Sequence, residues 1–120
     1  MKDRRKEVGR MGEKLAADML RDKGYEIVER NWASRLGELD LITQKDGQLV
    51  IVEVRTTCGG KYGYGFQSVD VRKQQKVRRL AIQYIQRKQL GHMPVRFDVV
   101  SVLLNRELLP LQIDHIEGAF

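Results

Sequence analysis

The stretch ELDLITQKDGQLVIVEVR, residues 38–55, constrains the fold more than any other part of the chain. Two β-rich runs flank Asp46-Gly47, a dipeptide that favours a two-residue type I′ turn because both central positions need positive φ. The second run, Leu49–Val54, is apolar on both faces apart from Glu53. A strand of this kind belongs in the middle of a sheet that is covered on both sides. The sequence therefore predicts a hairpin at the centre of an α/β fold.

The segments on either side of this hairpin predict helices and further strands. Apolar residues at helical spacing predict one helix over Lys6–Lys23 and a second from about Asp70 to Gln89. Polar and glycine-rich composition predicts loops at Asn31–Gly37 and Thr56–Phe66. Short β-rich runs predict strands over Tyr25–Arg30, Val95–Leu104 and Leu109–Ile116. The order α-β-β-β-α-β-β predicts a mixed sheet flanked by helices.

Length and composition indicate one globular domain over residues 1–120. Hydrophobic residues make up 42% and charged residues 32%, which is typical of a folded chain and excludes a disordered one. The longest apolar run, Leu49–Val52, is far too short to span a membrane, and the first ten residues lack the apolar stretch of a secretory signal. The single cysteine, Cys58, cannot form an internal disulfide bond. We therefore expect a cytoplasmic protein with no membrane partner.

The positive charge of the chain is concentrated in one segment. The net charge is +6, yet residues 71–97 contain eight bases and no acid, while the rest of the chain holds 14 bases against 16 acids. A concentrated basic face is typical of proteins that bind polyanions such as nucleic acids, although a solvated helix face gives the same pattern. One face of the helix predicted there carries a polar stripe of Arg72, Lys76, Arg79, Gln83 and Arg87.

The predicted hairpin also brings two acidic residues together. With Asp46-Gly47 as the turn, Asp40 lies opposite Glu53, and both side chains share one face. Two like charges about 5 Å apart repel by roughly 3 kcal/mol at an effective dielectric constant near 20. The pair must therefore share a proton, take a cation from a side chain, or bind a metal ion. Arg55, on the same face, could supply the cation, whereas a metal would be Mg²⁺ or Mn²⁺, which prefer oxygen ligands.

Glu13, on the first predicted helix, is a third acid of interest. It follows Gly12, and a glycine inside a helix costs about 1 kcal/mol relative to alanine. One interpretation is that the helix packs closely against the sheet at Gly12 and aims Glu13 into the carboxylate pair. The alternative is an ordinary solvated glutamate. Cys58, His92 and His115 form no recognised catalytic pattern, and we assign none of them a role.

Five motifs together resemble a known family. They are GRMGEKLAADML, RNWASRLGELDLI, VIVEVRT, RFDVVSV and the closing HIEGAF, and they extend over nearly the whole chain. In this order they resemble the YraN-like family of small bacterial proteins, within the PD-(D/E)XK nuclease superfamily and closest to its Holliday-junction-resolvase branch. The resemblance implies a restriction-endonuclease-like fold, with three α/β/α layers and a mixed central sheet.

The resemblance also assigns roles to individual residues. Asp40 matches the aspartate of the motif, Glu53 its (D/E), and Glu13 the glutamate of the first helix. With the carbonyl of Val54, these residues would hold Mg²⁺ or Mn²⁺ as a cofactor. Arg55 stands where the superfamily usually has a lysine, and an arginine stays protonated and cannot act as a base. The implied nucleic-acid contacts on the second helix are Arg72, Lys73, Gln74, Lys76 and Arg79. Glu38 matches the acid beside the aspartate, without a role that the motif fixes.

Three hypotheses about function follow. The first is a metal-dependent endonuclease that hydrolyses phosphodiester bonds in branched or single-stranded DNA. The second is a module that keeps the nuclease fold without catalysis and binds DNA or RNA, which Arg55 in place of lysine leaves open. The third is a protein-interaction domain whose basic helix docks an acidic partner. By analogy with resolvases, a symmetric homodimer is also expected.

Overall fold

The computed structural model describes residues 4–59 and 69–120. The chain forms a mixed sheet of strand order β1-β2-β3-β4-β5, in which β3 and β4 are parallel and the other neighbours antiparallel. The elements are α1 (Arg5–Asp22), β1 (Glu26–Ser34), β2 (Gly37–Lys45), β3 (Gln48–Cys58), α2 (Val71–Lys88), β4 (Val95–Leu104) and β5 (Pro110–Ile116).

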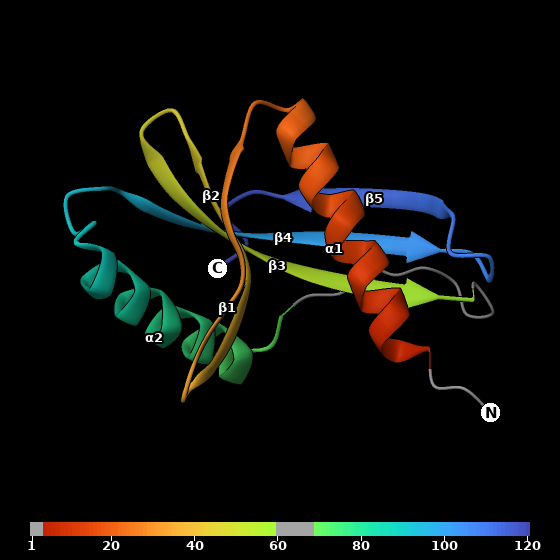
Figure 1. Ribbon diagram of the computed structural model, residues 1–120, viewed down its shortest axis with the longest axis horizontal. Coiled ribbons are helices and arrows are strands. Elements are labelled where there is room, and N and C mark those ends of the chain that lie inside the picture. The colour runs from red at the N-terminus through yellow and green to blue at the C-terminus, as the bar shows by residue number, and fades with distance from the viewer. Residues whose placement is uncertain (1–3, 60–68) are drawn as a thin grey trace.

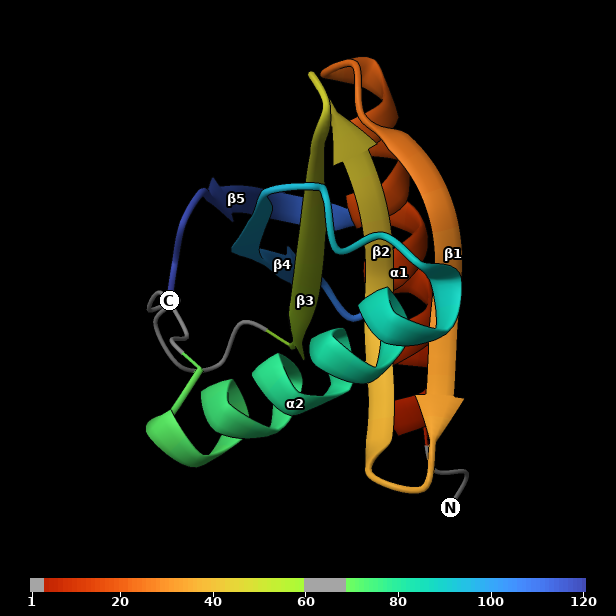
Figure 2. The same ribbon diagram turned by 90° about the vertical axis from the view of Figure 1, so that its left-hand side faces the viewer.

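The sheet lies between the two helices. Figure 2 shows α1 behind the sheet and α2 in front of it, and the apolar side chains divide accordingly into two clusters. In the central strand β3, Val50 and Val52 pack on the α1 side, whereas Leu49 and Ile51 pack on the α2 side. This alternation explains why the sequence of β3 is apolar on both faces. The predicted α/β fold with three layers is thus confirmed (Figure 1).

The turn of the central hairpin has the predicted geometry. Asp46 and Gly47 adopt φ values of 51° and 76°, as a type I′ turn requires. The register that this turn sets is also confirmed, from the pair Lys45–Gln48 to the pair Leu41–Val52.

Two predicted loops are wrong in part, because neighbouring strands extend the sheet. The loop predicted at Asn31–Gly37 is a continuation of β1, which pairs with β2 as far as Ser34 and Gly37. Trp32 holds this extension in place by packing edge-on against Tyr84 of α2, with ring centroids 5.3 Å apart. Likewise, β3 does not end before Thr56 but pairs with β4 up to Cys58. Residues 60–68 of the predicted glycine-rich loop lie outside the described residues.

In the part of the chain that the structure describes, neither helix is long and apolar enough to cross a membrane.

Candidate functional site

Along β2, the alternation of side chains between the two faces of the sheet is broken at Asp40. Leu39 and Ile42 both pack on the α2 side, whereas Leu41 between them packs on the α1 side. Regular alternation would place Leu39 and Leu41 on one face. The pairing of β2 with β3 ends at the same point, because Leu41–Val52 is its last pair. The strand is therefore irregular at Asp40.

Carboxylates replace the backbone pairing beyond this break. The backbone N–H of Val54 donates to Asp40 Oδ2 over 2.9 Å, and the backbone N–H of Asp40 donates to Glu53 Oε2 over 3.4 Å. The two acids are thus adjacent, as the predicted register required. They are linked by hydrogen bonds to their side chains and not by backbone pairing of β2 with β3. Lys73 of α2 contacts Glu53 as well. We call these three side chains, Asp40, Glu53 and Lys73, the carboxylate centre.

Within the carboxylate centre, Glu53 is buried, Asp40 is partly buried, and Lys73 supplies a cation. Glu53 is only 2% exposed, and its pKa is raised to about 7, first by burial and then by the charge of Asp40. Burial also raises the pKa of Asp40. The Nζ atom of Lys73, on the first turn of α2, lies 3.4 Å from Glu53 Oε1. Lys73 and not Arg55 is thus the cation beside Glu53, whereas the exposed Arg55 only weakly lowers the pKa of Asp40, as the smallest of five influences.

The close approach of α1 brings Glu13 toward this centre. Gly12 is buried, and a Cβ atom at this position would overlap the side chain of Thr56 on β3. The next residue, Glu13, has a raised pKa, caused first by burial and then by the charge of Asp40. A hydrogen bond from Asn31 partly offsets this shift. Glu13 is therefore within the electrostatic reach of Asp40 and is not an ordinary solvated glutamate.

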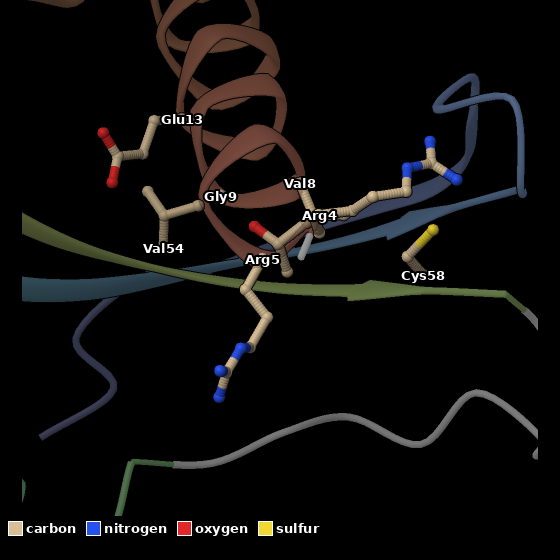
Figure 3. Close-up of a pocket in the computed structure, with 8 residues that line it drawn as sticks. Arg4, Arg5, Val8, Gly9, Glu13, Val54 and Cys58 are labelled. Atoms are coloured by element: carbon tan, nitrogen blue, oxygen red, sulfur yellow. The ribbon is translucent and has the colours of Figure 1, made fainter. Parts of the chain in front are cut away.

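Two hollows meet at Glu13. The larger has a volume of about 550 Å³, and Figure 3 shows Glu13 and Val54 at one end of it, with Arg4 extending toward Cys58 at the other. The second has a volume of about 380 Å³. Both include Gly9 and Glu13; the first is also lined by Arg4, Arg5, Val8, Val54, Thr56 and Cys58, and the second by Lys6, Arg10, Asn31 and Glu38.

The donor set of the carboxylate centre suits Mg²⁺ better than a metal whose coordination shell is filled entirely by protein ligands. Within residues 4–59 and 69–120, no three His, Cys, Asp or Glu side chains lie close enough together to hold a metal ion. Asp40 and Glu53 therefore offer two carboxylates, with Glu13 farther away. Mg²⁺ usually keeps several waters and binds one or two carboxylates together with substrate phosphates, whereas structural zinc needs four protein ligands. The backbone N–H of Val54 supports Asp40, and a role of its carbonyl as a ligand stays a prediction.

The five predicted nucleic-acid contacts separate into two groups. Lys73 belongs to the carboxylate centre, and Gln74 Nε2 donates to the carbonyl of Val69 over 2.8 Å. The other three are exposed, have no ion pair among the described residues, and together with Leu36 line a hollow of about 210 Å³. We call these three the basic row: Arg72, Lys76 and Arg79.

The rest of the predicted polar stripe contacts β1. The Oγ atom of Ser34 donates to Gln83 Oε1 over 2.7 Å, and the guanidinium of Arg87 lies 5.4 Å from the ring centroid of Trp32. The second half of the stripe is thus partly engaged with β1, although Arg87 remains exposed.

A second charged cluster, around Asp98, was missed by the sequence analysis. Asp98 is fully buried and accepts two hydrogen bonds of 2.8 Å from Arg96, one of 2.7 Å with His115 Nε2, and one of 3.0 Å from the N–H of Gly118. Burial alone raises the pKa of Asp98, but these hydrogen bonds lower it to about 2. In the sequence, the one sign of this cluster is that Asp98 interrupts a run predicted to be a buried strand. Its partner His115 is 17 residues away, which no local spacing identifies.

Comparisons with known proteins give one family. Residues 12–102 match a family described as uncharacterised protein family UPF0102. A UPF0102 protein of Pelotomaculum thermopropionicum is 45% identical over 120 residues, the whole of both chains. A relative in Moorella thermoacetica is 40% identical over 116 residues, 97% of each chain, and one in Rhodococcus opacus is 42% identical over 113 residues, 94% of this chain and 95% of the relative. The matched range contains Glu13, the carboxylate centre and the basic row.

Proposed function

We propose, from the premise that this chain belongs to the uncharacterised protein family UPF0102, that the protein binds DNA and hydrolyses its phosphodiester bonds as a Mg²⁺-dependent endonuclease. The observation that carries this proposal is the break in β2 at Asp40, where the partly buried carboxylate of Asp40 and the buried carboxylate of Glu53 are held together.

The energetics of the carboxylate centre support a functional role. Two adjacent carboxylates, one buried and one partly buried, are expensive, because burial disfavours their charged forms and the charge of Asp40 raises the pKa of Glu53 further. The raised pKa values of Glu53 and Asp40 reflect this cost. Strongly perturbed acids beside a pocket are typical of catalytic sites, and Val54, whose N–H donates to Asp40, lines the larger hollow. The basic row on α2, which has no ion pair within residues 4–59 and 69–120, supplies charge that would attract a polyanion.

Each residue of the centre has a distinct task in this proposal. Asp40 and Glu53 would hold the metal, and the N–H of Val54 keeps the carboxylate of Asp40 in position. A bound Mg²⁺ lowers the pKa of a water and stabilises the charge on the phosphate in the transition state. Lys73, 3.4 Å from Glu53, would neutralise negative charge at the scissile phosphate. Because it is an arginine, Arg55 can contribute positive charge but not a general base.

The ion pair between Lys73 and Glu53 also favours a second candidate function. Because Lys73 already neutralises part of the charge, the centre can persist without a metal. A nuclease-type fold that binds DNA or RNA without cleaving it is therefore the alternative.

The test compares the wild-type protein with Asp40→Asn and Glu53→Gln. Labelled branched DNA, single-stranded DNA, duplex DNA and RNA are incubated with Mg²⁺, with Mn²⁺ or with chelator, and both binding and cleavage are measured. We expect metal-dependent cleavage that both substitutions abolish while binding persists. Binding without cleavage by the wild type would favour the second candidate. Absence of binding at low ionic strength would exclude both.

A further inference from the structure

The turn of the β1–β2 hairpin contains Leu36, whose side chain is exposed while its backbone N–H is hydrogen-bonded. Leu36 is 41% exposed. Its N–H donates to Ser34 Oγ over 3.2 Å, and Ser34 Oγ in turn donates to Gln83 Oε1 on α2 over 2.7 Å. Figures 1 and 2 show the tip of this hairpin beside α2. The leucine is thus presented to solvent from a fixed position.

Lys76 passes directly beneath this tip. Gly37 follows Leu36 and has a φ of +141°, a conformation that side chains rarely adopt. A Cβ atom at Gly37 would lie 2.6 Å from Lys76 Cε and 3.1 Å from Lys76 Nζ, so the lysine side chain fills that space. The absence of a side chain at Gly37 therefore brings the ammonium group close to Leu36.

Leu36 and the basic row together form the tip hollow, of about 210 Å³. A single exposed leucine is ordinary on a protein surface. This one differs because Arg72, Lys76 and Arg79 surround it, and none of the three has an ion pair among the described residues. Among the described residues, the lining contains no acid. The tip hollow therefore suits a ligand with both an anionic group and an apolar surface.

Nucleic acids expose the apolar faces of their bases beside phosphates where bases are unpaired or a base step is distorted. In a continuous duplex the outer surface is phosphate and sugar, and the apolar faces of the bases are stacked on each other. An unpaired base can instead lie against a protein side chain while its phosphates contact cations. Apolar side chains such as leucine also insert at distorted base steps. With about 210 Å³, the tip hollow is smaller than ordinary small-molecule sites of roughly 300–1,000 Å³ and suits one base.

We propose that the tip hollow binds one unpaired nucleotide, with its base against Leu36 and its phosphates on the basic row, so that the protein selects DNA with unpaired or distorted bases over continuous duplex. This inference rests on the proposed function and names its substrate class. Arg72 lines the tip hollow, and its neighbour Lys73 contacts Glu53. Helix α2 therefore carries both the basic row of the tip hollow and the cation of the carboxylate centre.

The experiment measures affinity for a fully paired duplex and for the same duplex with one unpaired 2-aminopurine nucleotide. Leu36→Ser is compared with Ile82→Ser, a matched control because Ile82 is also exposed, at 54%, and lies on α2 outside the tip hollow. The wild type should prefer the unpaired substrate, and its binding should change the 2-aminopurine fluorescence. Leu36→Ser should reduce that preference by about tenfold, as expected for the loss of part of a leucine contact. Its duplex affinity, and both affinities of Ile82→Ser, should stay unchanged.

A triple Arg72→Ala, Lys76→Ala and Arg79→Ala variant separates this inference from the proposed function. It should lower affinity for both substrates and flatten the dependence of affinity on salt. If the wild type binds both substrates equally, or if Leu36→Ser keeps the preference, the inference is overturned while DNA binding stands. If the wild type binds neither substrate at low salt, the proposed function fails as well. Equal displacement of both DNAs by an acidic peptide, dependent on Leu36, would overturn the inference by assigning the tip hollow to a protein partner.

Discussion

The side chain of Thr56 on β3 occupies the space where a side chain at Gly12 of α1 would begin. Gly12→Ala should therefore lower the free energy of unfolding by about 1–3 kcal/mol, as overpacking does, although alanine is the better helix former. Gly9→Ala in the same helix is the control, because its Cβ would meet nothing within 4 Å. It should raise stability by up to about 1 kcal/mol. Urea denaturation measures both, and an equal response of the two variants would contradict the close approach of α1.

The stability of the metal-free protein should fall as pH rises from about 4.5 to about 7. Glu53 ionises near 4.5 in the unfolded chain and near 7 in the folded protein. Between these values the folded state binds more protons, so each rise in pH favours unfolding. The total loss is about 3 kcal/mol at 1.36 kcal/mol per pKa unit. Urea denaturation at several pH values measures the loss, and Glu53→Gln should remove most of it. A wild-type profile that is flat in this window would mean that Glu53 is not a buried acid.

Asp40→Asn should stabilise the metal-free protein at pH 8 while abolishing Mg²⁺ binding. The substitution removes the repulsion with Glu53, worth roughly 3 kcal/mol at most for two charges about 5 Å apart. The amide oxygen of asparagine can still accept the 2.9 Å hydrogen bond from Val54. Thermal unfolding and calorimetric titration with Mg²⁺ measure the two effects. Clear destabilisation of the metal-free variant would indicate that Asp40 acts mainly as a structural acceptor.

Lys73→Met should tighten Mg²⁺ binding at pH 8, where Glu53 is ionised. The ammonium group lies 3.4 Å from Glu53 and both competes with the metal and repels it. Its removal should increase affinity by roughly tenfold, equivalent to 1.4 kcal/mol, while slowing any cleavage. Lys88→Met on the same helix is the control, since Lys88 lies 4.0 Å from Glu29 and over the ring of Tyr84, and neither residue belongs to the carboxylate centre. Weaker Mg²⁺ binding by Lys73→Met would show that the lysine assists the metal.

Asp98→Asn should destabilise the protein by about 3 kcal/mol. Removal of one member of a buried ion pair costs about 3–5 kcal/mol, and the lower value is expected here because Arg96 is 26% exposed. Asp114→Asn on β5 is the control, since its hydrogen bond to Gln112 is exposed and its loss should cost little. Urea denaturation compares the two. A small effect at Asp98 would mean that Arg96 and His115 find other partners.

The fold was predictable from the sequence because its main determinants are local. The turn at Asp46-Gly47 fixes its own geometry, and from there the alternation of β3 fixes which side chains face each helix. The loop at Asn31–Gly37 was misjudged because an edge strand is half solvated and carries polar residues. Its strand character comes from pairing with β2 and from the packing of Trp32, neither of which is local.

The carboxylate centre was predictable only in part. The register brought Asp40 to Glu53, but extrapolating it assumed that the backbone ladder continues. The ladder ends because the carboxylates themselves take over the backbone donors. The role of Lys73 depends on where α2 docks on the sheet, and helical spacing says nothing about that placement.

Because two backbone N–H groups donate to the carboxylates at this break, the protonation of Asp40 and Glu53 can be followed on those backbone amides. An amide proton that is donated to a carboxylate experiences a different field once that carboxylate is protonated or engaged by a cation. The amides of Asp40 and Val54 are therefore built-in probes of Glu53 and Asp40, respectively. Their nuclear magnetic resonance shifts, followed through a titration, would assign each ionisation to its own side chain without a label or a substitution.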